Sequence, residues 1–162
     1  MSLSEPEAKL KMAVLNSNAM EFDRIDAITW LTNSGLPQEI ITRLDELWEK
    51  TKIIGGQIIK IGKIIIVEIF KFIKENPHLA VGIAIGAAVG ALTSMIPFFG
   101  PILAPLVTAI SIVIGGIAGY RLDQGQKPSD DVIGVTQELI LIARKFFELF
   151  ANIFNTLRTQ FS

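Results

Sequence analysis

The chain has no cysteine and a single histidine, His78, among its 162 residues. Without cysteine it has no disulfide framework, no thiol nucleophile and no thiolate zinc site. One histidine is too few for most histidine-based metal centres and acid–base pairs. The sequence also contains no serine-hydrolase, zinc-protease or calcium-loop motif. We therefore predict a protein that is not an enzyme and that holds neither a metal ion nor another cofactor.

The chain also lacks an excess of positive charge. Its 15 Lys and Arg residues are balanced by 16 Asp and Glu residues, for a formal net charge of −1. Binding to nucleic acid needs a basic excess that neutralises phosphates, so nucleic acid is excluded as a partner. Half of the residues are apolar, and the mean hydropathy is +0.48, which is high for an ordinary soluble domain.

Charge is distributed unevenly along the chain. Residues 1–50 hold nine acidic and five basic side chains, residues 51–77 hold two acidic and five basic ones, and residues 78–120 hold none. The sequence predicts an all-α membrane protein in which a two-helix hydrophobic hairpin is flanked by long amphipathic helices. We divide it into an N-terminal helical cap (1–36), a long basic amphipathic helix (37–76), a hydrophobic transmembrane hairpin (77–121), and a linker with a C-terminal amphipathic helix (122–162).

The uncharged stretch has the length and the turn of a helical hairpin. A helix needs roughly 20 apolar residues to cross a bilayer core of about 30 Å; Leu79–Ile96 supplies 18 and Ile102–Tyr120 supplies 19. Pro97, Gly100 and Pro101 lie between them and predict a tight turn, because proline stops a helix and glycine permits a reversal. Two alternatives stay open: the hairpin dips into the bilayer without emerging, or it forms the core of a soluble helical bundle.

Basic residues next to the two hydrophobic segments predict their orientation. Lys71, Lys74 and Arg121 lie just outside the segments, whereas the connecting turn has no charge. By the positive-inside rule both termini then lie in the cytoplasm. We therefore expect the protein in the inner, cytoplasmic membrane of a bacterium.

Small residues recur every four positions in both hydrophobic segments. Positions four apart lie on one face of a helix, and in lipid such strips let helices approach closely. The strips pack on each other within one chain, or they also join several copies; we favour the second interpretation and expect a homo-oligomer. The residues are Gly82, Gly86 and Gly90 in the first segment and Ser111, Gly115 and Gly119 in the second.

Five lysines fall on one side of the helix expected over residues 37–76. Their spacing repeats every 11 residues, which keeps them aligned on a nearly straight helix, and isoleucines occupy most of the remaining surface. Such a helix binds the surface of anionic lipid, lines an oligomeric pore, or is a bundle helix with one solvated side. The five residues are Lys52, Lys60, Lys63, Lys71 and Lys74.

One short motif resembles a known family. Glu75-Asn76-Pro77, followed by Val81-Gly82-Ile83-Ala84 and Gly86, is similar to the membrane-anchor motif of small stationary-phase inner-membrane proteins of bacteria that tether ribosomes. The resemblance covers residues 75–90, implies a membrane anchor, and carries no functional residues over to this chain. More loosely, the layout also resembles that of colicin-type pore domains, in which other helices surround a hydrophobic hairpin.

These features predict two functions. The first is an oligomeric integral membrane protein that forms a pore or permeabilises a membrane, as an effector or toxin does. The alternative is a non-catalytic membrane anchor or membrane-shaping scaffold that docks a cytosolic protein partner through the acidic residues 1–50. Both have anionic lipid as a partner, and the first also needs further copies of the chain.

Overall fold

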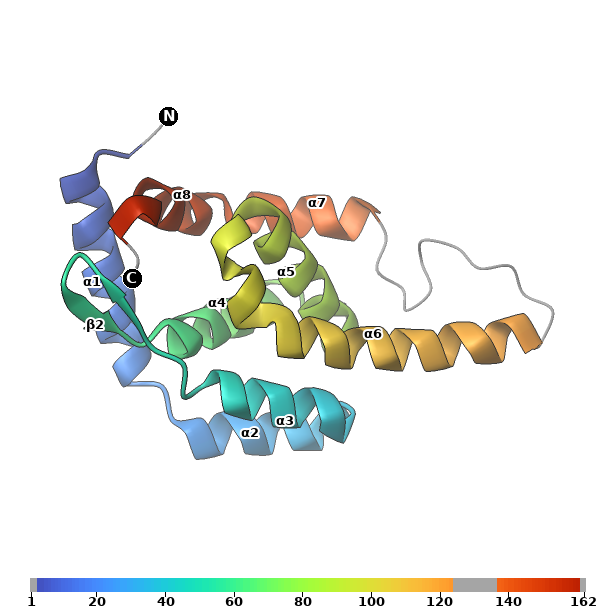
Figure 1. The fold of residues 1–162 in the computed structure, drawn as a ribbon. Helices are drawn as coiled ribbons and strands as arrows, with labels where there is room; N and C mark the ends of the chain where they lie inside the picture. Colours follow the sequence, from blue (N-terminus) through green and yellow to red (C-terminus); the bar gives the residue numbers. More distant parts are fainter. Residues whose placement is uncertain (1–2, 124–136, 161–162) are drawn as a thin grey trace.

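The computed structural model describes residues 3–123 and 137–160, and the side chains in these ranges except those of 113–123. Eight α-helices and one short β-hairpin make up this described part (Figure 1), so the helical class predicted from the sequence is confirmed. The elements are α1 (Glu5–Met20), α2 (Arg24–Asn33), α3 (Gln38–Leu47), β1 (Lys52–Ile54), β2 (Gln57–Ile59), α4 (Ile61–Glu75), α5 (Val81–Met95), α6 (Gly100–Asp123), α7 (Gln137–Phe146) and α8 (Glu148–Thr156). Short 3-10 turns, η1 (Pro97–Phe99) and η2 (Arg158–Gln160), precede α6 and follow α8.

Local signals in the sequence begin and end the first two helices. The Ser4 hydroxyl caps α1 by accepting a hydrogen bond from the Glu7 amide (3.3 Å), and the Asp23 carboxylate caps α2 by accepting one from the Asp26 amide (3.0 Å). α2 ends before Gly35, whose φ of +83° is a conformation that glycine adopts without strain. These caps fix where the acidic residues at the start of α2 lie.

The single long helix expected over residues 37–76 is wrong, because this stretch folds as α3, a β-hairpin and α4. Strands β1 and β2 pair antiparallel with Ile53 opposite Ile58, and Gly55 and Gly56 form the turn with φ of +59° and +82°. Two consecutive residues with positive φ make the two-residue turn that suits the twist of a hairpin. Isoleucines on both sides favour strands over helix.

α4 lies at the centre of the fold, and most of its side chains are buried. α1 packs against α4 and α8, α3 packs against α4 and α6, and α5 packs against α4 and α7. Aromatic side chains join α4 to the C-terminal helices: the ring centroid of Phe72 lies 5.4 Å from that of Phe146 and 5.6 Å from that of Phe147. The first and last helices of the chain therefore share one hydrophobic core.

The predicted membrane-spanning hairpin is wrong. Within the described residues, no helix is both long enough and apolar enough to cross a bilayer. α5 has 15 residues, which is about 22 Å at 1.5 Å per residue, whereas the hydrocarbon core is about 30 Å thick. This finding contradicts the expected membrane protein with a transmembrane hairpin. It also contradicts the expected location in the bacterial inner membrane, which depended on that hairpin.

The apolar character of α5 has another physical cause. Ala84, Ala88 and Leu92 are fully buried, and both α4 and α7 pack against α5. A helix that is apolar on every side is typical of a membrane span, but also of a helix inside a protein core. The expected turn does lie after α5, because Pro97 begins η1 and α6 starts at Gly100 and Pro101.

Candidate functional site

A groove lies between α2 and the C-terminal half of α4. It encloses a cavity of about 460 Å³, and apolar atoms dominate its surface. We call it the α2–α4 groove. Its lining residues are Glu21, Phe22, Asp23, Asp26, Ala27 and Trp30 from the end of α1, the connection and α2, and Phe70, Ile73 and Lys74 from α4.

Aromatic side chains form the floor of the α2–α4 groove. The ring centroid of Phe70 lies 5.3 Å from that of Phe22 and 5.4 Å from that of Trp30. Phe70 is buried, whereas 44% of the Trp30 surface is exposed. Tryptophan is one of the side chains that are enriched among the residues contributing most to protein–protein binding, because it offers a large apolar area at a small entropic cost.

Carboxylates surround this floor. Glu21, Asp23 and Asp26 all line the groove at its α1–α2 end. None of the three forms an ion pair with any residue in the described ranges 3–123 and 137–160. Lys74 is the single cation among the lining residues. The groove therefore combines an apolar floor with an acidic rim whose carboxylates have no ion-pair partner in the described ranges, although Asp23 also caps α2.

An arginine next to the groove fixes α2 against α3. Arg24 donates from Nε to Asp45 Oδ1 (2.9 Å) and from Nη2 to the Asp45 carbonyl (3.2 Å), and its Nη1 pairs with Glu49. The hydrogen bonds to Asp45 and then Glu49 raise the pKa of Arg24 above its ordinary value. This arginine neutralises Asp45 of α3 and Glu49 just beyond α3, and it forms no ion pair with the carboxylates of the groove.

A second contact fixes the other side of the groove. The ammonium of Lys63 donates to the Met20 carbonyl (3.3 Å) and lies 5.3 Å from the ring centroid of Trp48. Trp48 in turn lies 5.9 Å from Phe22. The end of α1 is thereby held on the start of α4, which places Glu21 and Phe22 at the edge of the groove.

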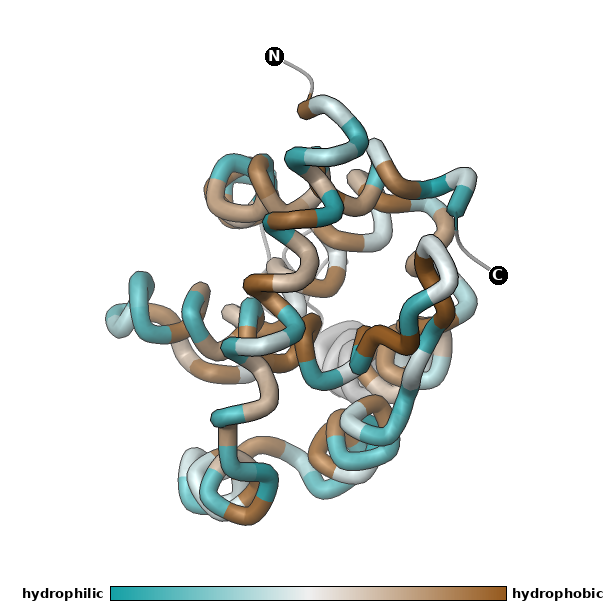
Figure 2. The backbone as a smooth tube through the Cα atoms, turned by 90° about the vertical axis from the view of Figure 1, so that its left-hand side faces the viewer, coloured by the Kyte–Doolittle hydropathy of each residue, from teal (hydrophilic) through white to brown (hydrophobic). Residues whose placement is uncertain are grey.

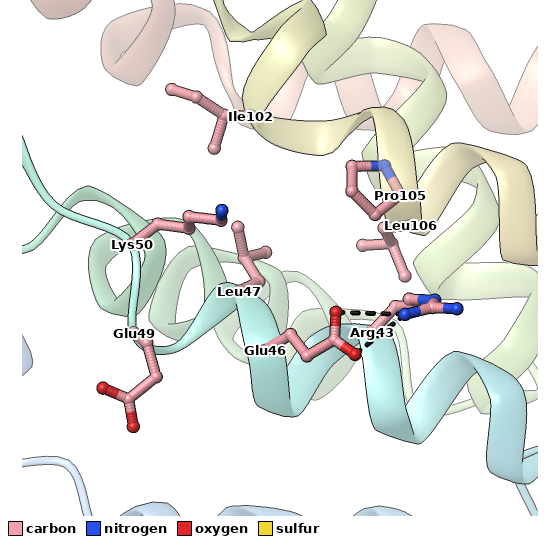
Figure 3. Close-up of a pocket in the computed structure, with 8 residues that line it drawn as sticks. All are labelled: Arg43, Glu46, Leu47, Glu49, Lys50, Ile102, Pro105 and Leu106. Carbon is pink, nitrogen blue, oxygen red and sulfur yellow. Dashed lines mark hydrogen bonds and ion pairs between the residues drawn. The ribbon is translucent and has the colours of Figure 1, made fainter.

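A different cleft, of about 420 Å³, lies between α3 and the first turns of α6 (Figure 3). Leu47, Ile102 and Leu106 provide its apolar side. Most of its charges are already compensated, because Arg43 pairs with Glu46 (2.8 Å) and Glu49 pairs with Arg24. This cleft has much less unpaired charge with which to select a partner than the α2–α4 groove has.

The two hollows can be compared with the groupings of side chains that hold metal ions or act as nucleophile and base. Within the described residues, no cluster of three or more His, Cys, Asp or Glu side chains could hold a metal ion. The α2–α4 groove has carboxylates and aromatic rings but no nucleophile beside a base. Its apolar floor and its carboxylates are groups that can bind an apolar and basic segment.

The structure separates the five lysines of the predicted basic stripe. Lys52 lies on β1, Lys60 lies just before α4, and the other three lie on α4. Lys71 pairs with the buried Glu68 (3.0 Å), Lys63 contacts the end of α1, and Lys74 lines the α2–α4 groove. Each of the five lysines thus has a different environment, and their roles at lipid or in a pore remain predictions.

The strips of small residues lie on α5 and α6. A Cβ atom on Gly82 would lie 3.7 Å from Leu36 Cδ1, and one on Gly90 would meet nothing within 4 Å. The structure therefore does not place another helix against α5 at Gly90, and packing of the two strips on each other is not seen there. Ser111 is exposed on α6. Half-buried Gly86 completes the strip on α5, whereas the side-chain surroundings of Gly115 and Gly119 lie outside the described residues. Assembly through these strips stays a prediction.

Comparisons of this chain with protein-family models, with curated proteins and with solved structures find no match. The resemblance of residues 75–90 to a membrane anchor stays a resemblance of sequence. In the structure these residues are the end of α4, the connection, and the first two-thirds of α5. Among the features described, the geometry of the α2–α4 groove therefore bears most directly on function.

Proposed function

We propose that this chain is a non-catalytic docking protein that binds a basic amphipathic segment of a partner protein in the α2–α4 groove. The observation that carries the proposal is a rim of carboxylates without ion-pair partners in the described ranges, around an aromatic floor on which Trp30 is exposed. The alternative function predicted from the sequence was a membrane anchor that docks a partner protein through residues 1–50. The proposal keeps the docking through this region and drops the membrane anchor. The pore-forming function stays an untested prediction, and it has lost its premise of spanning helices.

The groove offers a bound segment two kinds of interaction. An apolar side chain would cover Trp30, Phe70 and Ile73, and burying a Leu or Phe side chain contributes about 1.5–3 kcal/mol. Lys or Arg side chains of the segment would pair with the carboxylates of the rim. Such exposed ion pairs contribute about 0.2–1 kcal/mol each, and they weaken with salt. The floor therefore supplies most of the affinity, and the rim selects for positive charge.

Trp30 provides a direct readout of binding. The chain has two tryptophans, so a Trp48→Phe variant leaves Trp30 as the single tryptophan reporter. The probe is a synthetic 18-residue amphipathic helix with leucines on one face and lysines on the other. We expect the Leu/Lys peptide to shift the Trp30 emission and a Leu/Glu peptide of the same length to leave it unchanged. Equal binding of the two peptides would show that the rim does not select charge.

Two charge-reversal variants distinguish binding of the peptide in the groove from a general effect of the net charge of the protein. Asp26 and Glu39 both lie in the first turn of a helix, so Asp26→Lys and Glu39→Lys cause the same change in net charge and the same loss of helix-dipole interaction. We expect Asp26→Lys to weaken peptide binding about threefold to tenfold, or about 0.7–1.4 kcal/mol, because the reversal replaces an attraction with a repulsion. Glu39→Lys should change its affinity less than twofold. If both variants bind equally, the peptide does not bind in the groove and the proposal fails.

A further inference from the structure

The cleft shown in Figure 3 continues along the whole length of α3, beside α6 (Figure 1). Lys50, just after α3, lines it together with Ile102, near the start of α6. Glu39, at the start of α3, lines a second hollow of about 300 Å³ together with Ile112, so the two helices run antiparallel. Arg43 lines both hollows, which therefore adjoin. We call this surface the α3–α6 face and define it by Glu39, Arg43, Glu46, Lys50, Pro105 and Ile112.

The charged residues of the α3–α6 face alternate in sign along the chain. They are spaced four, three and four residues apart, which places them on one side of the helix, and all are exposed. In order they are Glu39, Arg43, Glu46 and Lys50. Arg43 pairs with Glu46 of the same chain (2.8 Å). The two outer charges, Glu39 and Lys50, form no ion pair with any residue in the ranges 3–123 and 137–160.

This order of charges is complementary to itself when the helix is reversed. A two-fold axis that crosses α3 between residues 44 and 45 places Glu39 of one copy opposite Lys50 of the other, because these two positions are equally far from the axis. The same axis places Arg43 opposite Glu46 of the second copy, because these positions are centred on the same point. Since a two-fold axis repeats every contact, one interface contains two Glu39–Lys50 pairs and a network of four charges between them.

Apolar residues of α6 accompany these charges. Ile112 is 58% exposed at the Glu39 end of the cleft, and exposed Pro105 lies at the Lys50 end. The same two-fold axis brings the Ile112 end of one copy to the Pro105 end of the other. Hydrophilic and hydrophobic segments alternate along α2 and α3, the helices at the bottom of Figure 2, so the polar side of α3 lies beside apolar residues of α6. Apolar area buried between two copies supplies affinity, and the charges fix their orientation.

We propose that a second copy of this chain docks antiparallel on the α3–α6 face and forms a two-fold dimer. A second copy fits this face better than an unrelated protein does, because both charge pairs are centred on one point, as a two-fold interface requires. The inference is independent of the proposed function, since no residue of the α3–α6 face lines the α2–α4 groove.

The test measures the mass of the purified chain by sedimentation over a range of concentrations at low salt. We expect the wild type to dimerise, and Glu39→Lys and Lys50→Glu each to weaken the dimer about tenfold or more. The effect is large because the symmetry turns two attractions into two repulsions at once. Asp26→Lys is the matched control: it changes the net charge and the first turn of a helix as Glu39→Lys does, but lies outside the α3–α6 face. It should change the dimer affinity less than twofold.

Exchanging the two charges distinguishes pairing across the interface from damage to the fold. The double variant Glu39→Lys/Lys50→Glu has the net charge of the wild type and inverted pairs, so it should dimerise within about threefold of the wild type. An equimolar mixture of the two single variants should form a heterodimer more tightly than either variant dimerises alone, because the lysines of one copy meet the glutamates of the other. A mixture of Asp26→Lys with Lys50→Glu has the same net charges and should associate more weakly, since one of its two outer pairs is repulsive.

The outcomes for the dimer and for the α2–α4 groove can be read separately. A wild type that stays monomeric at all concentrations overturns the inference, and so does a dimer that neither single variant weakens. A double variant that dimerises no better than the single variants also overturns it. The weakened Glu39→Lys variant should still bind the Leu/Lys peptide as the wild type does. Absence of peptide binding overturns the proposed function and leaves the dimer standing.

Discussion

Gly62 lies where α4 begins against the end of α3, and no larger residue fits there. A Cβ atom on Gly62 would lie 1.6 Å from the Leu47 carbonyl oxygen, 2.8 Å from the Leu47 carbonyl carbon and 3.2 Å from Lys50 Cβ. The first two contacts are with backbone, which cannot rotate away as a side chain does. Since real Cβ atoms stay at least 3.0 Å from such atoms, Gly62→Ala must move the two segments apart by about 1.4 Å or more.

The cost of Gly62→Ala follows from what this separation breaks. The Gly62 amide donates to the Lys50 carbonyl (3.1 Å), and losing such a bond costs about 0.5–1.5 kcal/mol. Leu47 and Ile61 are buried at the same contact, and partial exposure of two such side chains costs about 2–3 kcal/mol. The higher helix propensity of alanine offsets about 1 kcal/mol of this loss in stability. We therefore expect a net loss of about 1.5–3.5 kcal/mol in the free energy of unfolding.

Gly90→Ala is the matched control, because Gly90 is also a helical glycine and a Cβ on it meets nothing within 4 Å. It should raise the free energy of unfolding by up to about 1 kcal/mol, through helix propensity alone. Urea denaturation followed by circular dichroism measures both variants. A Gly62→Ala variant as stable as the wild type, or stabilised like Gly90→Ala, would refute the close approach of α3 and α4.

Two further predictions concern the contacts that support the groove and the core. Arg24→Ala removes the ion pairs to Asp45 and Glu49; we expect a loss of about 1 kcal/mol in urea denaturation at low salt and a smaller loss in about 1 M NaCl, because these groups are partly exposed. A loss independent of salt would contradict an electrostatic role. Phe72→Ala empties a fully buried site beside Phe146 and Phe147 and should cost about 3–5 kcal/mol. It should lower Tm by about 6 °C or more, and a Tm within a degree or two of the wild type would show that Phe72 is not a core residue.

The helical class and the turn after the first hydrophobic segment could be predicted from local signals. Proline and glycine at residues 97–101 act within a few residues of themselves, so their effect does not depend on the rest of the fold. The sequence also contains a signal for the β-hairpin, since Gly55-Gly56 between isoleucine pairs is typical of a hairpin turn. The lysine spacing pointed instead to one continuous helix, and a helical period does not exclude a strand of three residues.

The rest depends on contacts between distant residues. The apolar sequence of α5 is equally compatible with lipid and with a protein core, and only its packing on α4 and α7 decides between them. The α2–α4 groove joins Asp26 and Trp30 to Phe70, some 40 residues later. Its acidic side was visible in the charge balance of residues 1–50. The aromatic floor of the groove could not be predicted from the sequence, because no local pattern shows that Trp30 contacts Phe70.

The packing of α5 on α7 has a consequence for the synthesis of the chain on the ribosome. α5 ends at Met95 and α7 begins at Gln137, so the apolar surface of α5 leaves the exit tunnel well before the helix that covers it. At about 5–20 residues per second, this interval lasts about 2–8 s. During that time the face of α5 that α7 covers in the folded chain has no partner helix, so its apolar side chains stay exposed until α7 has been made.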